Sequence, residues 1–332
     1  MLLRLFKGTG TGTIFLIFVT LLSVWASSFI KLKGHFSLYF DLDPMPLYGI
    51  LSSLMGTHPL PGIIFTLSLV SLMAFQMVNL NTSLFFINKR TFLPAVIYIL
   101  LSGLFPQYQL LNPAIFGAMF LMLAIRRIME TYRIQGTAYN FFDAGILIGV
   151  GSLFYANLIW FGLLVIIGIS LLRTGNIKEI VISVIGLVTP YILTFGIYYV
   201  LGKDLKNLLS ILEYNLFGEP ASYVFTPLTI VALSFAGLSA LVSMVYLLML
   251  MNTIKIKSRK TFILLFWVFL ISIGVYFAQP SVSVEMVWLI GIPLSYVLAH
   301  YFVFVRKKLI PEILFSCFYI LIILIQIFYM SG

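Results

Sequence analysis

The side chains that could do chemistry are few, and they lie between apolar segments rather than inside them. Only 9% of the 332 residues are Asp, Glu, Lys or Arg, and none of these lies in the middle of a predicted membrane span. The loop at residues 31–61 holds two carboxylates, Asp41 and Asp43, together with Lys31 and Lys33. Carboxylates exchange protons and lysines bind phosphate groups, so this loop is a first candidate for a functional site.

A second loop, residues 202–220, carries Lys203 and Lys206. Lysines next to a membrane commonly extend toward the interface and contact phospholipid head groups. The lysines of both loops therefore have two interpretations. They contact lipids in a general way, or they bind the phosphate of a specific lipid-linked ligand.

The sequence does not indicate a metal or a cofactor. It lacks the residue spacings of zinc proteases, serine hydrolases and EF-hand calcium loops. Cys317 is the single cysteine, which excludes an intramolecular disulfide and a metal site built from several thiolates. We therefore expect no cofactor. A divalent metal is possible, but no residue pattern in the sequence supports one.

The composition indicates a membrane protein. Hydrophobic residues make up 61% of the chain and the mean hydropathy is +1.11. Soluble domains are about 45–50% apolar and about 25% charged. A soluble enzyme, a disordered chain and a DNA-binding domain are therefore excluded.

We predict an all-α, polytopic transmembrane helix bundle of about eleven spans, within a range of about nine to twelve. Each span needs about 20 apolar residues to cross a hydrocarbon core about 30 Å thick. Several of the predicted spans are short and form tight pairs. The predicted spans cover residues 13–30, 62–86, 92–105, 113–125, 142–154, 157–172, 180–201, 224–251, 261–278, 286–305 and 311–330.

The distribution of basic residues predicts the orientation. With the N-terminus inside and the loops alternating, most of the 20 lysines and arginines fall on the inner side, as the positive-inside rule requires. Only Lys31, Lys33, Lys203 and Lys206 fall on the outer side. The net charge of +10 is then a topology signal with some attraction to anionic membrane lipids, and we expect no nucleic-acid partner. We predict a multi-pass protein of the bacterial inner (cytoplasmic) membrane.

Each outer loop is predicted to contain a short amphipathic helix. Asp43 followed by Pro44 has the pattern of a helix cap and a first helical residue, and apolar residues follow at helical spacing. Asp204 can cap the second helix, which Gly218 ends. The two helices either wall a site at the lipid–water boundary or are ordinary connectors that rest on the bilayer.

Two stretches of the chain alternate hairpins with basic inner loops. They read FPQYQLLNPAIFGAMFLMLAIRRIMETYR and FDAGILIGVGSLFYANLIWFGLLVIIGISLLR. This layout resembles the membrane module of GT-C type glycosyltransferases over residues 1–220, which implies about seven spans in that region. The remaining residues, 221–332, are then a C-terminal membrane segment of about four helices. The whole chain is also similar to an uncharacterised multi-pass inner-membrane family of Bacteroidota-type bacteria.

The resemblance to GT-C enzymes implies a reaction. Such enzymes take a sugar from a polyprenyl-phosphate donor at the outer face, and a carboxylate in the first outer loop deprotonates the acceptor hydroxyl. That role maps onto Asp41, or less directly onto Asp43. The leaving phosphate would then meet lysines of the two outer loops. These are Lys31, Lys33, Lys203 and Lys206.

A second hypothesis comes from a different functional class. Enzymes of the GT-C type tend to carry an acid in the second outer loop, where this chain has Asn112. They also commonly have a large soluble outer domain, which the chain lacks. These differences favour a non-catalytic membrane subunit, a scaffold or lipid-handling component of an envelope complex with a membrane-protein partner.

Overall fold

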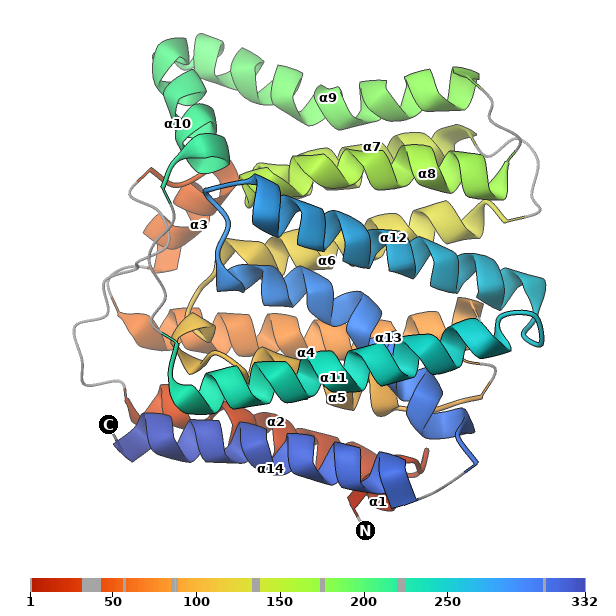
Figure 1. Ribbon diagram of the computed structural model, residues 1–332. Helices are drawn as coiled ribbons and strands as arrows, with labels where there is room; N and C mark the ends of the chain where they lie inside the picture. Colours follow the sequence, from red (N-terminus) through yellow and green to blue (C-terminus); the bar gives the residue numbers. More distant parts are fainter. Residues whose placement is uncertain are drawn as a thin grey trace.

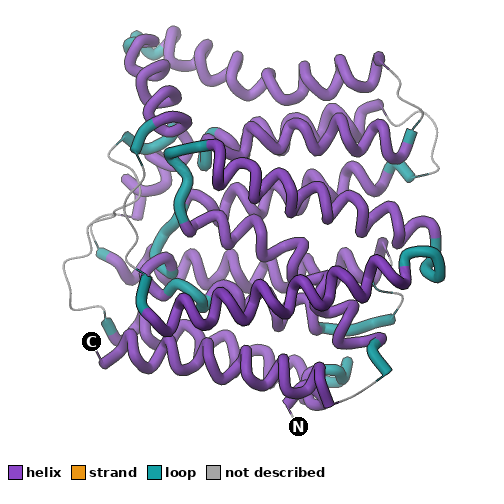
Figure 2. Tube along the Cα trace, viewed as in Figure 1, coloured by secondary structure: helices purple, strands orange, loops and turns teal. Residues whose placement is uncertain are grey.

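The computed structural model describes most of the chain, in ranges separated by short gaps. These ranges are 2–31, 43–55, 58–84, 87, 89–132, 138–173, 177–219, 225–306 and 309–331. Within them the chain consists of fourteen α-helices and three short 3-10 helices joined by loops (Figures 1 and 2). The predicted all-α class is therefore confirmed for the described residues.

The helices follow one another with short connections. The first half contains α1 (Leu2–Phe6), α2 (Thr11–Ile30), α3 (Pro46–Met55), α4 (Pro59–Leu84), α5 (Leu93–Ser102), η1 (Pro106–Tyr108), α6 (Pro113–Glu130) and α7 (Ala138–Ser152). The second half contains η2 (Ala156–Phe161), α8 (Gly162–Leu172), α9 (Ile177–Val200), α10 (Leu205–Phe217), α11 (Pro227–Leu250), α12 (Ile256–Ala278), η3 (Val284–Met286), α13 (Val287–Phe304) and α14 (Leu309–Ser331).

Seven of the described helices are long and apolar enough to cross a membrane. They are α2, α4, α9, α11, α12, α13 with η3, and α14. The chain is accordingly an integral, multi-pass membrane protein. The other four predicted spans correspond to α5, α6, α7 and η2 with α8. α5 has ten residues, and a helix of that length is about 15 Å long, half of the hydrocarbon core.

The long helices run side by side and alternate in direction (Figure 1). α9 lies along one edge of the bundle, and α2 and α14 lie along the opposite edge. The short helices α3 and α10 sit at one end, which we call the α3–α10 end. We call the opposite end, where α1 lies and α11 joins α12, the basic end.

Charge is divided unequally between these two ends. Alternating helix direction brings most described lysines and arginines to the basic end. The described basic residues there are Arg4, Lys7, Lys89, Arg90, Arg126, Arg127, Arg173, Lys178, Lys255, Lys257, Arg259, Lys260 and Arg306. At the α3–α10 end, Lys31 follows α2, Lys203 precedes α10 and Lys206 lies in the first turn of α10. The charge partition that the sequence predicts is thus present in the fold, and its direction relative to the membrane stays a prediction.

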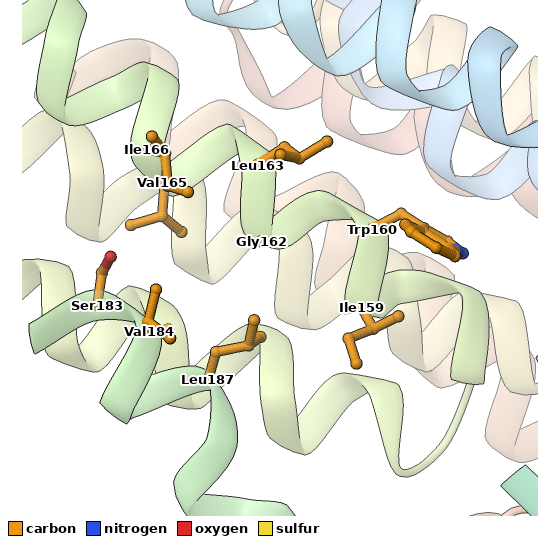
Figure 3. A pocket seen from close by; sticks show the side chains of 10 residues that line it. Ile159, Trp160, Gly162, Leu163, Val165, Ile166, Ser183, Val184 and Leu187 are labelled. Atoms are coloured by element: carbon orange, nitrogen blue, oxygen red, sulfur yellow. The ribbon is translucent and has the colours of Figure 1, made fainter. Parts of the chain in front are cut away.

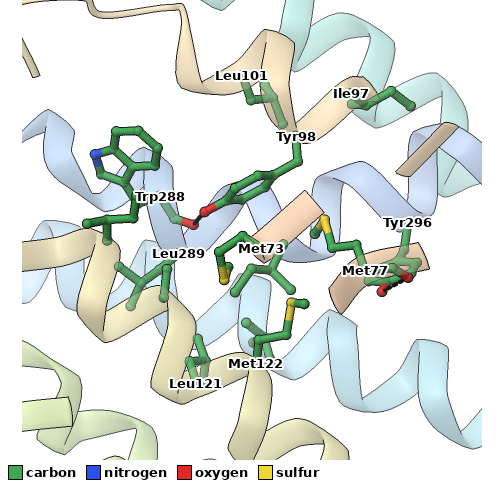
Figure 4. Packing of buried hydrophobic residues seen from close by; sticks show 14 of the residues in the cluster. Met73, Met77, Ile97, Tyr98, Leu101, Leu121, Met122, Trp288, Leu289 and Tyr296 are labelled. Atoms are coloured by element: carbon green, nitrogen blue, oxygen red, sulfur yellow. Dashed lines mark hydrogen bonds between the residues drawn. The ribbon is translucent and has the colours of Figure 1, made fainter. Parts of the chain in front are cut away.

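α13 forms the centre of the core. In the segment formed by η3 and α13, 72% of the apolar stretch is buried inside the protein, whereas the corresponding share for α9 is 17%. Two tyrosines fix its position by hydrogen bonds to backbone carbonyls (Figure 4). Tyr98 of α5 donates to Trp288 O at 3.2 Å, and Tyr296 of α13 donates to Met77 O of α4 at 2.9 Å. Apolar side chains from both halves of the chain surround them, so the core is continuous across the predicted division at residue 220.

The second predicted amphipathic helix, α10, is confirmed with both of its ends. The Asp204 side chain accepts a hydrogen bond from Lys206 N at 2.9 Å, and Gly218 N donates to Tyr214 O at 2.7 Å. The first, α3, begins at Pro46, two residues later than predicted. Met45 O accepts from Gly49 N at 2.8 Å, so Met45 occupies the cap position. The prediction that Asp43 caps this helix is therefore wrong.

Candidate functional site

Lys31 lies where α2 ends. Its backbone N–H donates to Ser27 O at 3.0 Å, as a residue that closes a helix does. Its ammonium group lies over the ring of Tyr329 in α14, 4.4 Å from the ring centroid. A cation over an aromatic face is attracted by the ring quadrupole and keeps its N–H donors available. The ion pairs among described residues involve other side chains, so no described carboxylate neutralises Lys31.

A cavity of about 730 Å³ opens beside Lys31, at the α3–α10 end. We call it the Lys31 cavity. Its walls are the loop with η1, the first turn of α11 and the last turns of α14. The lining residues are Lys31, Pro106, Gln107, Thr226, Pro227, Leu228, Thr229, Val231, Ile325, Phe328 and Tyr329. Most of these are apolar, and Lys31 is the single charged residue among them.

Buried amides hold the walls of this cavity in place. Gln109 accepts from Ser28 Oγ at 2.5 Å and donates to Val24 O at 3.0 Å, which ties the η1 loop to α2. Gln326 of α14 accepts from the Ser27 hydroxyl and donates to Gly103 O at 2.7 Å. Both glutamines are fully buried. Their four hydrogen bonds join α2, α14 and the η1 loop into one rigid wall.

Glu285 forms a second buried polar group at this end. It is 6% exposed, and it accepts from Ser283 N at 3.1 Å and from Tyr155 OH at 3.4 Å. It also accepts from the Ser283 hydroxyl, which lies 3.3 Å from Tyr108 OH. Because its hydrogen bonds come from segments far apart in sequence, Glu285 links loops rather than facing an open site.

By the predicted spans, Glu285 belongs to the loop between residues 278 and 286. Its burial has one signal in the sequence. Glu285 stands among apolar residues in the stretch SVSVEMVWL, where a solvated loop would have further polar residues. Gln109 and Gln326 were not identified from the sequence, because neutral amides inside apolar runs have no diagnostic spacing.

α10 and α3 are joined to the bundle by a separate set of hydrogen bonds. Asn215 of α10 donates to Asp43 O at 2.7 Å. Asn157 donates to Asn215 O at 3.3 Å and to Ser281 Oγ at 3.0 Å. Tyr48 of α3 donates to Leu111 O at 2.9 Å. These hydrogen bonds join α10 to the residues just before α3, and they join both helices to the segments that contain Asn157, Ser281 and Leu111.

A family model matches residues 45–331, most of the chain. It is the model of a family of unknown function, DUF6427. The chain belongs to DUF6427. The comparison with curated proteins and the comparison with solved structures gave no match. The DUF6427 match includes Glu285, α10 and every lining residue of the Lys31 cavity except Lys31 itself.

The predicted site residues of this DUF6427 protein do not all come together. Lys31 borders the Lys31 cavity, near the edge formed by α2 and α14 (Figure 1). Lys203 belongs to the α9–α10 connection at the other edge, and its ammonium lies 5.2 Å from the Tyr198 ring centroid. Lys206 lies in the first turn of α10. Asp43 is exposed beside α10. Asp41 and Lys33 lie outside the described residues.

A smaller space of about 220 Å³ lies between α8 and α9 and is almost wholly apolar. Figure 3 shows Val165 and Ile166 of α8 and Val184 and Leu187 of α9 among the side chains that line it. Such a lining suits hydrocarbon and offers no charged group. Among the described residues of the DUF6427 chain, no three His, Cys, Asp or Glu side chains are grouped to hold a metal ion. The Lys31 cavity, which combines apolar walls with a charged side chain, is therefore the candidate functional site at the α3–α10 end.

Proposed function

We propose that this protein binds the phosphate head group of a membrane lipid in the Lys31 cavity, at the outer face of the bacterial inner membrane. The supporting observation is the position of the Lys31 ammonium at the edge of a large, mainly apolar cavity. The volume of about 730 Å³ lies within the range of about 300–1,000 Å³ typical of ligand sites.

The chemistry of the lining agrees with an amphipathic ligand. Lys31 supplies the positive charge, and the first turn of α11, where Thr226 is the cap, adds the partial positive charge of a helix N-terminus. Leu228, Val231 and Ile325 provide apolar surface for a hydrocarbon chain. A lipid whose phosphate lies at Lys31 and whose hydrocarbon chain lies along α11 and α14 would contact both the positively charged part and the apolar part of the cavity.

The proposed role is that of a lipid-handling component of an envelope complex. Native mass spectrometry of the purified full-length chain with undecaprenyl phosphate tests it. We expect one bound lipid per chain, and Lys31→Gln should weaken binding about tenfold, because a charge-assisted hydrogen bond contributes about 1.5–3 kcal/mol.

Lys203→Gln is the matched control, since it removes the same charge from the same end of the bundle but outside the cavity. Its binding should stay within a factor of about two of wild type. No bound lipid, or an equal loss in both variants, would contradict the proposal.

A second candidate is a transferase of the GT-C type that uses a polyprenyl-phosphate sugar. The observation that favours it is the position of Lys31, which stands at the start of the loop that contains Asp41 and borders a lipid-sized cavity. Asp41 would then remove the acceptor proton while the phosphate leaves toward Lys31. Asp41→Asn should abolish a glycan modification at normal expression. Unchanged glycolipid and glycan profiles in this variant and in a deletion strain would contradict the transferase.

A further inference from the structure

A separate cavity of about 450 Å³ lies at the basic end, between the C-terminal turns of α11 and α13 and the start of α12. We call it the basic-end cavity. Its lining residues are Tyr246, Leu250, Thr253, Ile254, Lys255, Ser258, Phe262, His300, Phe304 and Arg306. α11 has 24 residues and also lines the Lys31 cavity at its other end, so the two cavities lie toward opposite ends of a helix about 36 Å long.

The basic-end cavity has an excess of positive charge. Lys255 and Arg306 are exposed and line it, whereas none of its described lining residues is Asp or Glu. The ion pairs found among the described residues use other basic side chains. A third cation is close, since the ammonium of Lys89 lies 5.3 Å from the ring centroid of Phe304. An anion that entered this cavity would meet several unneutralised positive charges.

His300 adds a buried polar group to the same wall. It is 2% exposed, and its Nδ1 atom has no hydrogen-bond partner in the described part of the chain. The rings of Phe262 and Phe304 flank the imidazole, with centroids at 5.2 and 4.7 Å. A buried nitrogen without a hydrogen-bond partner destabilises the folded protein. A ligand oxygen that accepted a hydrogen bond from Nδ1 would remove that destabilisation.

The wall around His300 is held in place before any ligand arrives. Tyr246 of α11 donates to Phe304 O at 3.0 Å, which fixes the last turn of α13 against α11. Tyr246 and Tyr301 also pack edge to face, with centroids 5.3 Å apart. A site whose groups are already positioned loses little conformational entropy on binding.

We propose that the basic-end cavity binds a phosphate-type anion between Lys255, Arg306 and His300. Arg306 and Lys255 supply charge-assisted hydrogen bonds, and His300 Nδ1 supplies a neutral one. The phosphate of an anionic lipid and free inorganic phosphate share this chemistry. The proposal concerns a different cavity from the Lys31 cavity, so either one can fail without the other.

Two measurements on the full-length protein distinguish the sources of the anion. Isothermal titration calorimetry in detergent micelles uses inorganic phosphate, and native mass spectrometry uses phosphatidic acid with phosphatidylcholine as the neutral reference. The double variant Lys255→Gln/Arg306→Gln should weaken binding at least about tenfold, because it removes both charge-assisted hydrogen bonds to the anion. His300→Phe keeps the ring volume and should weaken binding about fivefold.

Arg259→Gln is the matched control, because it removes a charge from the same end but does not line the cavity. Its affinity should stay within a factor of about two of wild type, and the thermal midpoints of all variants should show that they are folded. Binding of inorganic phosphate that the double variant weakens supports a soluble anion. Binding of phosphatidic acid alone, weakened in the same way, supports a lipid head group. The proposal is overturned if neither probe binds, or if the control and the double variant lose the same affinity.

Discussion

Gln109 and Gln326 each use a donor and an acceptor of one side chain to join two segments. Gln109 connects the η1 loop to Ser28 and Val24 of α2, and Gln326 connects α14 to Ser27 and to Gly103. An amide can make these bonds without the cost of burying a charge. In a protein with so few charged residues, such amides fix helix positions that apolar packing alone leaves free to slide.

The variant Gln109→Leu should lower the free energy of unfolding by about 1–2 kcal/mol, because it removes two buried hydrogen bonds and leaves the Ser28 hydroxyl without its acceptor. Unfolding by a denaturing detergent, followed by tryptophan fluorescence, measures the change. Gln107→Leu makes the same substitution two residues earlier at an exposed position and should change stability by less than about 0.5 kcal/mol. Equal losses in the two variants would show that the hydrogen bonds of Gln109 are not the cause.

The residue types in the sequence were enough to predict a candidate site residue at Lys31, but not the surroundings of Glu285 and His300. Lys31 was selected because it is a basic residue at an outer helix end, and it borders a cavity. Glu285 and His300 could not be assigned their surroundings, since the groups around them come from segments that are distant in sequence. Local spacing reports on neighbours along one helix and carries no information about such contacts.

α7 and α9 pack closely against each other, with glycines on both sides of the contact. A side chain on Gly149 of α7 would meet Leu187 O of α9 at 2.5 Å. A side chain on Gly186 of α9 would overlap with Phe142 O of α7. Small residues let helix backbones approach in a membrane, where apolar burial does not drive helices together. The attachment of α9 to the bundle depends on this contact.

Gly186→Ala should therefore destabilise the protein by about 1–3 kcal/mol, because the new methyl group meets backbone atoms that cannot move aside cheaply. Gly196→Ala lies on the same helix with nothing within 4 Å of the added carbon. It should be neutral or stabilising by up to about 1 kcal/mol, since alanine favours the helix. Thermal unfolding midpoints in the same detergent compare the two. A similar midpoint for both variants would argue against close packing of α7 on α9.

The start and end signals of helices were predicted with mixed success. Asp204 caps the start of α10 and Gly218 ends it, as predicted, because cap and stop residues act through local hydrogen bonds. α3 begins at Pro46 rather than at Pro44, since both prolines suit a first helical position and the sequence does not choose between them. The prediction of about eleven spans also counted short apolar helices, because hydropathy does not detect the 3-10 turns and loops that shorten α5 and α8.

The whole molecule is polarised along the helix direction. Most described basic residues lie at the basic end, and the short helices α3 and α10 lie at the other. The positive-inside rule then predicts that the basic end lies in the cytoplasm. In that orientation the Lys31 cavity would be outside and the basic-end cavity inside.

Cysteine labelling in intact cells tests this orientation. In a Cys317→Ala background, a membrane-impermeant maleimide should modify Ser53→Cys, which is an exposed position on α3. It should not modify Thr253→Cys, an exposed position between α11 and α12, until the membrane is permeabilised. The reverse labelling pattern would place α3 in the cytoplasm, and the Lys31 cavity would then face the inner leaflet.

The unequal burial of α9 and α13 has a consequence for biogenesis. α9 is strongly apolar and only 17% of it is buried inside the protein, so lipid alone can solvate this helix when it leaves the translocon. The segment of η3 and α13 is 72% buried and carries Glu285 and His300. Ionisable side chains are costly in hydrocarbon. α13 therefore depends on helices synthesised much earlier, α4 and α5, to shield it, and a chain truncated before it would leave the middle of the bundle unfilled.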